Sequence, residues 1–453
     1  MDTIKLKEQV EVIRETFGYI NRFKDKTFVI KLDDSLSSHA LYPLLIRDIV
    51  HLHQAGIRIV LVPGAKTRID EILATYKIPC KTVGGVRVST AQAIPFIKMA
   101  AFDVSNKIMT MLAENNTCAV VGNWVQARGI GVHDGVDFQH SGLVEKVKTS
   151  VLQSVLEQHL VPIFPNIGWS GVGKPYNISS NDLAFTISVE LQAAKLFYIT
   201  NTPGITADLY KVPEGIYAST DGVISQLRVD EAESFLKLNA GKEYDQSLEL
   251  LNLGVRACKS GVDRVHIIDG RIEGVLLKEI FSNRGLGTMV YANQHDNIRP
   301  MTFADVAEVL RIMQPLVQNQ TLVPRSAEEI EKSIGEFAVY EVDGTIHGCA
   351  ALHTFPDASG EIHALAVDDM YASLGIGAKL VSYFVDRAKK ERLGRVFVLT
   401  TQAADWFLEA GFRQADISAL PKEKRAVYNT RRNSLILAQR LTKKRVRGGT
   451  RVE

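Results

Sequence analysis

The chain has 453 residues, of which 46% are hydrophobic and 23% are charged, with a formal net charge of +2. This length exceeds that of one ordinary hydrophobic core, so we expect two or three domains. The near-neutral charge gives no reason to expect nucleic acid as a partner. No apolar run reaches the roughly 20 residues that span a membrane, the charged N-terminus lacks a signal-peptide core, and the four cysteines are scattered. We therefore expect a cytoplasmic protein that does not bind membranes.

The first predicted element is an amphipathic helix over residues 2–23. Its apolar stripe consists of residues spaced three and four apart, namely Leu6, Val10, Ile13, Phe17 and Ile20. The stripe must be buried, either on its own domain or on a neighbouring subunit, and the sequence leaves both options open. Together with the sheet that follows, it leads us to expect a homo-oligomer, from a dimer to a hexamer.

From Thr27 to about Val290, continuous apolar runs alternate with helical stretches. The runs cover residues 27–31, 57–62, 118–121, 161–166, 196–200 and 264–268. Runs of this kind are typical of parallel strands that are covered on both faces. We therefore predict a doubly wound α/β domain with a mostly parallel sheet. Ligands of such a sheet lie beyond the carboxyl ends of its strands.

Polar and glycine-bearing segments occur throughout this region, and several follow the predicted strands directly. They read VPGAKTRID (62–70), GGVRVS (84–89), DGVDFQHSGLV (134–144), YNISSNDLA (176–184), TNTPGI (200–205) and GVDRVHIIDG (261–270). Their order resembles that of the amino-acid kinase family, most closely its acetylglutamate kinase branch. On this resemblance Arg87 and Asn177 fall on ligand-binding positions of the family.

The sequence departs from that of a working kinase at three places. Asp33 and Asp34 follow Lys31, where the family has two glycines whose amides contact the transferred phosphoryl group. Two carboxylates there would repel ATP. Asn181 replaces the aspartate that organises the family's site, and Val223 replaces a second ATP-facing lysine. Because phosphoryl transfer depends on positioning and charge neutralisation, we predict no kinase activity and a regulatory role for this domain.

The resemblance also implies a site for a regulator. In arginine-inhibited acetylglutamate kinases and synthases, the segment that corresponds to residues 262–288 binds arginine together with the N-terminal helix. The candidate contacts for L-arginine as effector are Tyr19, His266, Glu279, Gly285, Gly287 and Thr288. The alternative is that His266 and Glu279 only stabilise the local structure.

A polar junction near residues 292–297 precedes a second domain. Its predicted elements are helices over 302–316 and 327–334, strands over 336–342, 346–355 and 361–368, a helix after Gly375, a strand over 396–399 and a short helix with Trp406. Asp343-Gly344 is a hairpin signal. This order predicts an α+β domain. The expected divisions are an N-terminal helix (1–25), a kinase-like domain (26–291), a linker (292–297), an α+β domain (298–442) and a basic tail (443–453).

Gly375 and Gly377 form a turn between a strand and a helix. A helix N-terminus has unpaired N–H groups, and glycine lets that backbone approach a bulky anion closely. With its flanking strands the turn resembles the acetyl-CoA-binding half of GCN5-related N-acetyltransferases (GNAT). The resemblance implies acetyl-CoA as the donor, although Ala372 stands where the family has a side chain that contacts the pyrophosphate. The residues expected to hold it are Ala366, Val367, Gly375, Ile376, Gly377 and Ala378.

Amide formation from a thioester needs a base for the amine, an oxyanion donor and an acid for the leaving thiolate. Glu361 is the candidate base, because its match in related synthases is catalytic; the alternative is a solvated strand end. A backbone N–H near Ala366 or Val367 would polarise the thioester carbonyl. Thr400, or else Tyr428, would pass a proton to the thiolate.

Three further residues match positions that hold glutamate in N-acetylglutamate synthases, namely Arg325, Arg432 and Ser434. The planar fork of arginine suits a carboxylate, because it offers two parallel hydrogen bonds. The nearby charges of Lys422, Lys424 and Arg425 are expected to be solvated.

A degenerate kinase-like domain followed by an acetyltransferase domain resembles the order in bacterial N-acetylglutamate synthases. The resemblance implies acetyl transfer from acetyl-CoA to L-glutamate, the first step of arginine biosynthesis, under regulation by L-arginine. We expect no metal, since His133, Asp134 and His140 lack a metal-ligand spacing. The alternatives are an acetylglutamate kinase, an arginine sensor with a vestigial second domain, and an acetyltransferase for another amine.

Overall fold

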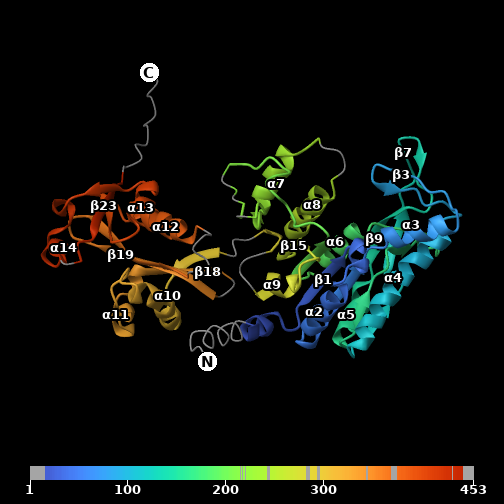
Figure 1. Ribbon diagram of the computed structural model, residues 1–453, viewed down its shortest axis with the longest axis horizontal. Helices are drawn as coiled ribbons and strands as arrows, with labels where there is room; N and C mark the ends of the chain where they lie inside the picture. Colours follow the sequence, from blue (N-terminus) through green and yellow to red (C-terminus); the bar gives the residue numbers. More distant parts are fainter. Residues whose placement is uncertain are drawn as a thin grey trace, which may run out of the picture. The chain divides into compact units, whose positions relative to one another are not determined.

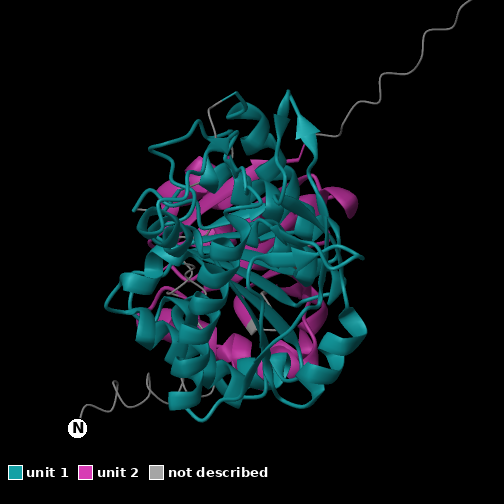
Figure 2. Ribbon diagram, turned by 90° about the vertical axis from the view of Figure 1, so that its right-hand side faces the viewer, with its two compact units in different colours: residues 1–293 teal, residues 294–453 magenta. Residues whose placement is uncertain are grey.

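The structure is a computed structural model that describes residues 16–214, 216, 218–219, 221–241, 245–281, 286–292, 296–342, 345–368, 375–430 and 432–441. The chain divides into two compact units, Met1–Asn293 and Gln294–Glu453, which Figure 2 colours separately. We describe each unit by itself. Gly285, Ala372, the turn at 343–344 and the basic tail lie outside the described residues. No helix in these ranges is long and apolar enough to cross a membrane.

The first unit is built on an eight-stranded sheet (Figure 1). Its strands in spatial order are β14 (Gln226–Arg228), β16 (Thr288–Tyr291), β15 (Arg264–Asp269), β13 (Lys195–Thr200), β1 (Thr27–Leu32), β2 (Arg58–Pro63), β10 (Val161–Ile163) and β5 (Ala119–Val121). All neighbours pair in parallel except β15 and β16. The predicted mostly parallel sheet is confirmed.

One predicted strand is wrong in length. The apolar run over 161–166 holds only the short strand β10, and a separate strand, β11 (Ile167–Trp169), follows it in a different sheet. Pro165 explains the break, because a proline nitrogen has no N–H to donate to a strand ladder. The break redirects the chain into the smaller sheet.

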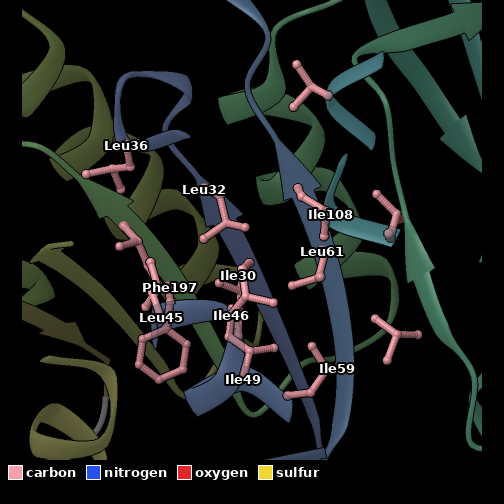
Figure 3. Close-up of a cluster of buried hydrophobic side chains, with 14 of the residues drawn as sticks. Ile30, Leu32, Leu36, Leu45, Ile46, Ile49, Ile59, Leu61, Ile108 and Phe197 are labelled. Carbon is pink, nitrogen blue, oxygen red and sulfur yellow. The ribbon is translucent and has the colours of Figure 1, made fainter. Parts of the chain in front are cut away.

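Helices cover both faces of the large sheet, because alternate side chains of each strand point to opposite sides. One face packs against α2 (Tyr42–Gln54), α3 (Lys66–Thr75), α4 (Ile94–Glu114) and α9 (Val275–Phe281). The other packs against α5 (Thr149–Glu157), α6 (Ser180–Glu190), α7 (Val229–Leu238) and α8 (Gln246–Lys259). Figure 3 shows the first face, where Ile30 and Leu61 of the strands lie among Ile46 and Ile49 of α2. The domain is therefore doubly wound, as predicted.

The segments that resemble the kinase family lie partly in smaller elements of the first unit. A four-stranded sheet contains β12 (Pro175–Asn177), β11, β6 (Val125–Gly129) and β9 (Gly142–Val147). Two short hairpins are formed by β3 (Thr82–Val83) with β4 (Val86–Arg87) and by β7 (Val132–His133) with β8 (Val136–Asp137). Of the predicted N-terminal helix, residues 16–23 are described and are helical.

The second unit is a seven-stranded sheet with helices on both faces. Its strands in spatial order are β17 (Asp296–Pro300), β18 (Phe337–Val342), β19 (Thr345–Thr354), β20 (Ser359–Val367), β21 (Arg395–Thr400), β23 (Leu435–Arg440) and β22 (Arg413–Ala415). Only β20 and β21 pair in parallel. The helices are α10 (Val306–Gln318) and α11 (Ala327–Lys332) on one face, and α12 (Ile376–Lys390) and α13 (Ala404–Glu409) on the other. This confirms the predicted α+β domain.

Candidate active site

Two central strands of the second unit pair over only part of their length. β20 pairs with β21 from Ser359 to Glu361, although β20 continues to Val367 and β21 continues to Thr400. Beyond Phe397 the ladder of β21 is made with β23 alone. Glu361 is therefore the last paired residue of β20, and the predicted donor-binding residues of β20 and Thr400 of β21 follow the point where the two strands diverge.

A bulge interrupts β20 just after this point. Cys349 of β19 faces Ala366 and Ala351 faces His363, so two residues of β20 stand opposite one residue of β19. Ala364, in the bulge, has a φ of 52°, a backbone conformation that side chains rarely adopt. The predicted oxyanion donors Ala366 and Val367 come directly after the bulge, on the part of β20 that has left β21.

The helix predicted to bind the pyrophosphate begins as expected. Gly375 is the residue before α12 and has a φ of 69°, which favours glycine. Gly377 lies close to another side chain, because a Cβ there would be only 3.3 Å from the Trp406 ring. Ile376 is buried in the core, whereas Ala378 is exposed, so only the backbone of the first turn can serve an anion.

Glu361 is buried, which argues against the reading of a solvated strand end. Its Oε2 lies 2.7 Å from Nζ of Lys424 on α14 (Lys422–Ala426). A buried carboxylate needs a counter-ion, and Lys424 supplies it. The prediction that Lys424 is solvated is therefore wrong. Arg425 is also engaged, since it donates to the carbonyl oxygens of Ser418 and Leu420.

The two candidate acids differ in what their hydroxyl groups do. Oγ1 of Thr400 accepts a hydrogen bond from the Ala403 N–H at 3.0 Å, which leaves the Thr400 proton for another acceptor. The Tyr428 hydroxyl donates its proton to the carbonyl oxygen of Ser434 at 2.7 Å. The geometry favours Thr400 as the acid, and Tyr428 instead fixes the segment that carries Ser434.

The two predicted glutamate-binding arginines come from distant parts of the unit. Nη2 of Arg325 lies 3.1 Å from Nδ1 of His363, two residues after Glu361 on β20. Arg432 donates to the carbonyl oxygens of Gln320 at 3.1 Å and Thr321 at 2.6 Å. Arg325 is thus placed beside the candidate base, while Arg432 joins the C-terminal segment to the loop after α10.

In the first unit, the aspartates that replace the kinase glycines serve the protein itself. Asp34 accepts hydrogen bonds from the N–H groups of Thr67 and Arg68, so its carboxylate occupies the N-terminus of α3. Burial would raise the pKa of Asp33, but the ammonium of Lys31 at 2.8 Å outweighs burial and holds that pKa below its usual range. The N-terminus of α3 and the ammonium of Lys31, both of which could bind a phosphate, are therefore occupied by carboxylates of the protein itself.

The predicted ligand-binding residues of the kinase-like domain are engaged in the same way. Arg87 forms an ion pair with Asp70 at 2.5 Å. Asn177 bonds to the side chains of Asn166 at 3.0 Å and Ser89 at 3.1 Å. Among the residues that the structure describes, no group of three or more His, Cys, Asp and Glu is placed to hold a metal ion.

The predicted effector residues His266 and Glu279 form a buried pair. Nδ1 of His266 lies 2.8 Å from Oε1 of Glu279, and Oε2 of Glu279 accepts from the N–H of Leu286 at 2.7 Å. Burial and the nearby charge of Lys195 lower the pKa of His266 to about 4. The ring is therefore neutral at pH 7 and donates its Nδ1–H to the carboxylate of Glu279, while its Nε2 has no partner within the described ranges.

Cations surround this pair beneath the N-terminal helix. The buried ammonium of Lys195 lies 5.3 Å from the ring centre of Tyr19 and 5.1 Å from that of Phe23. Arg264 is also buried, and burial with the charge of Arg22 lowers its pKa to about 10. The structure thus brings Tyr19 close to His266 and Glu279 through Lys195.

Gly287 and Thr288 are held by the fold itself. A Cβ at Gly287 would lie 2.1 Å from the carbonyl oxygen of Ile267, so the position admits only glycine. The Thr288 hydroxyl accepts from the N–H of Ile205 at 2.9 Å and donates to the carbonyl of Ile224 at 2.8 Å. The Thr288 hydroxyl is therefore already engaged within the protein.

Comparison with known proteins identifies both domains. Residues 26–269 match the amino acid kinase family, and residues 304–412 match the acetyltransferase (GNAT) family. The chain is 34% identical over 449 residues to an amino-acid acetyltransferase of Ralstonia nicotianae, with 97% of each chain covered. It is 33% identical over 445 residues to that of Escherichia coli K12, covering 95% of this chain and 97% of the relative.

Two solved structures of N-acetylglutamate synthase from Neisseria gonorrhoeae are also similar. Each is 32% identical and covers 96% of this chain and 99% of its own. The structure with coenzyme A and L-arginine gives a TM-score of 0.79, and that with coenzyme A and N-acetylglutamate gives 0.59. By sequence over nearly its whole length, and by the order of its two domains, the chain belongs to the amino-acid acetyltransferases, a family of acyltransferases in which a kinase-like domain precedes a GNAT domain.

Proposed function

We propose that this enzyme transfers the acetyl group of acetyl-CoA to the amine of L-glutamate, the first step of arginine biosynthesis, and that L-arginine regulates it. The observation that carries the proposal is the divergence of β20 from β21, with Glu361 and Arg325 beside it. The complexes of the neisserial synthase with coenzyme A, L-arginine and N-acetylglutamate support the same ligands.

In the proposed mechanism, Glu361 accepts a proton from the ammonium of glutamate, directly or through water. The neutral amine then attacks the thioester carbonyl, and the C–N bond forms while the carbonyl oxygen becomes an oxyanion. A backbone N–H of β20 after the bulge stabilises that charge. After attack the nitrogen of the intermediate still carries one proton more than the amide product. The C–S bond breaks as the intermediate collapses, and Thr400 relays this second proton from the nitrogen to the departing thiolate of coenzyme A, so that its own hydroxyl is restored.

The acceptor's carboxylates fit the two arginines. Arg325 is half-buried and turned toward the β20 face that carries Glu361, so it can bind a carboxylate near the amine. Arg432 and Ser434 both lie in the segment just before β23. A guanidinium that meets a carboxylate with two hydrogen bonds gives both affinity and orientation.

For regulation, the buried cluster of the first unit has the charges that arginine requires. Glu279 offers a carboxylate to the guanidinium or the α-amine, and Nε2 of His266 offers an acceptor. Lys195 and Arg264 offer cations to the α-carboxylate. These groups are buried beneath the N-terminal helix that carries Tyr19 and Phe23. Arginine therefore reaches them only when this helix moves, and we propose that this movement is the regulatory signal.

The function is tested by measuring CoA release with acetyl-CoA and L-glutamate, with and without L-arginine. In Arg432→Ala, the KM for glutamate should rise by about tenfold or more, because a charged hydrogen bond to the acceptor is lost. Arg425→Ala is the matched control, since Arg425 likewise donates to two loop carbonyls. Acetyl-CoA binding without glutamate-dependent release would show that the acceptor is wrong.

The rival function, a phosphotransferase, makes the opposite prediction. We expect no ADP formation from ATP with N-acetylglutamate, because Asp34 occupies the N-terminus of α3 and Asp33 neutralises Lys31. Asp33→Gly/Asp34→Gly should not create activity either, since Asn181 and Val223 remain. A coupled ADP assay, with added ADP as its positive control, measures both. ADP formation that depends on N-acetylglutamate would contradict the regulatory role.

A further inference from the structure

Four side chains form a chain of polar contacts beside the candidate base. Nδ1 of His363 lies 3.1 Å from the Arg325 guanidinium, and its Nε2 lies 3.5 Å from Oε2 of Glu336. The other oxygen of Glu336 lies 2.7 Å from Nδ1 of His353 on the neighbouring strand β19. His363 is only 13% exposed, so water competes little for these contacts.

The identity of its partners fixes the protonation of His363. A guanidinium has N–H donors and no acceptor, so Nδ1 of His363 must accept from Arg325. The single proton of the neutral ring is then on Nε2, where it faces the carboxylate of Glu336. Glu336 therefore selects the tautomer in which His363 can hold Arg325.

We propose that His363 is a positioning residue that holds Arg325 for the substrate carboxylate while the ring is neutral and releases Arg325 when the ring is protonated. The inference rests on the proposed function, because it takes Arg325 as a ligand of glutamate. It adds that glutamate binding by this enzyme weakens in acid through one histidine.

The groups around His363 act on its pKa in opposite directions, because Arg325 lowers it whereas Glu336 and Glu361 raise it. They come from every element packed against it, namely Glu336 before β18, Arg325 before α11, Glu361 on β20, His353 on β19 and Lys424 on α14. Burial lowers the pKa of His363, and the bond from Glu336 and the charge of Glu361 offset this only in part. The ring is thus neutral at pH 7 and is protonated only below the usual histidine value.

Protonation would place two N–H donors and two positive charges against each other. Nδ1–H of His363 would face the guanidinium of Arg325, and both would seek the same acceptors. Arg325 must then turn away, since its charge is permanent. The KM for glutamate should therefore rise as pH falls, whereas the KM for acetyl-CoA should not.

The test measures kcat and the KM for glutamate from pH 5.5 to 8 in the wild type, His363→Asn and His363→Phe. In the wild type the KM should be higher at pH 5.5 than at pH 7, because the lowered pKa of His363 lets the ring take up a proton only in acid. In His363→Asn, Oδ1 of the asparagine can replace Nδ1 as the acceptor for Arg325, but asparagine does not titrate. The KM of this variant for glutamate should therefore be independent of pH. Phenylalanine keeps the ring and loses the acceptor, so its KM should be about tenfold higher at every pH.

The outcomes separate the inference from the function on which it rests. A rise in KM at low pH that persists in His363→Asn would overturn the inference and leave the glutamate assignment intact. A KM in His363→Phe equal to that of the wild type would do the same. Absence of glutamate-dependent CoA release in the wild type would overturn both. An unchanged KM for acetyl-CoA in each variant checks that the unit is folded.

Discussion

Glu361→Gln is expected to lower kcat by about 100-fold or more, because the amine of glutamate loses the base that accepts its proton. The KM values for glutamate and acetyl-CoA should change little, since glutamine has the same shape. Glutamine also leaves Lys424 without its counter-ion at 2.7 Å, so the folded state must be checked by the thermal midpoint of unfolding. CoA release at saturating substrates, measured against pH, gives the answer.

The matched control for Glu361→Gln is Glu341→Gln. Glu341 is a partly buried carboxylate on β18 of the same sheet, and it is paired with Arg299 at 2.5 Å. Its substitution breaks an ion pair of the same kind without touching β20, so kcat should stay near that of the wild type. If Glu361→Gln instead keeps a kcat within a few-fold of that of the wild type, the assignment of Glu361 as the base is contradicted.

Much of the fold follows from local sequence pattern. The continuous apolar runs of β1, β2, β13 and β15 predict parallel strands, because both faces of each strand are buried. The run over 161–166 predicts a strand that is too long, because its apolar residues continue through Pro165, where the hydrogen-bond ladder of β10 has ended. Hydropathy records burial, whereas the end of a strand depends on where its N–H groups find partners.

The site was predictable where one segment carries the chemistry. Glu361, the bulged end of β20 and the Gly375 turn follow one another in sequence, so the pattern that predicts them is local. Lys424 was misjudged because a lysine on a short polar helix normally faces water, and only the fold sets it beside Glu361. The Arg325–His363–Glu336 contacts join three separate segments, although the Glu361-Ile362-His363 alternation already placed two titratable groups on one face.

The aspartates of the first unit show a similar limit. The sequence predicts that Asp33 and Asp34 repel ATP, which is a statement about charge alone. The structure adds that Asp34 takes the amides at the start of α3 and that Asp33 takes the ammonium of Lys31. A phosphate at this helix end would have to displace the protein's own carboxylate from the N–H groups of Thr67 and Arg68. The two aspartates thus also pair with groups of the protein that would otherwise lack these partners.

Glu279→Gln is expected to raise the arginine concentration for half-maximal effect by about tenfold or more, because a buried carboxylate that pairs with arginine is lost. Glutamine has the same shape and can still accept from the N–H of Leu286. The change removes the negative charge that offsets Lys195 and Arg264, so a cationic ligand is repelled. CoA release over a range of L-arginine concentrations measures it.

The control for Glu279→Gln is Asp269→Asn, a buried carboxylate on the same strand as His266 that pairs with Arg271 at 2.7 Å. It should leave the arginine response near that of the wild type. This comparison distinguishes the structural reading of the His266–Glu279 pair from the regulatory one. If the pair is purely structural, Glu279→Gln should lower the thermal midpoint of unfolding without changing the arginine response. A regulatory pair changes the response whatever it does to stability. At a given arginine concentration the variant site is less occupied, so arginine should change the KM for glutamate less than in the wild type. Where regulation acts on affinity, coupling is reciprocal, so glutamate should change the affinity for arginine by the same factor as arginine changes the affinity for glutamate.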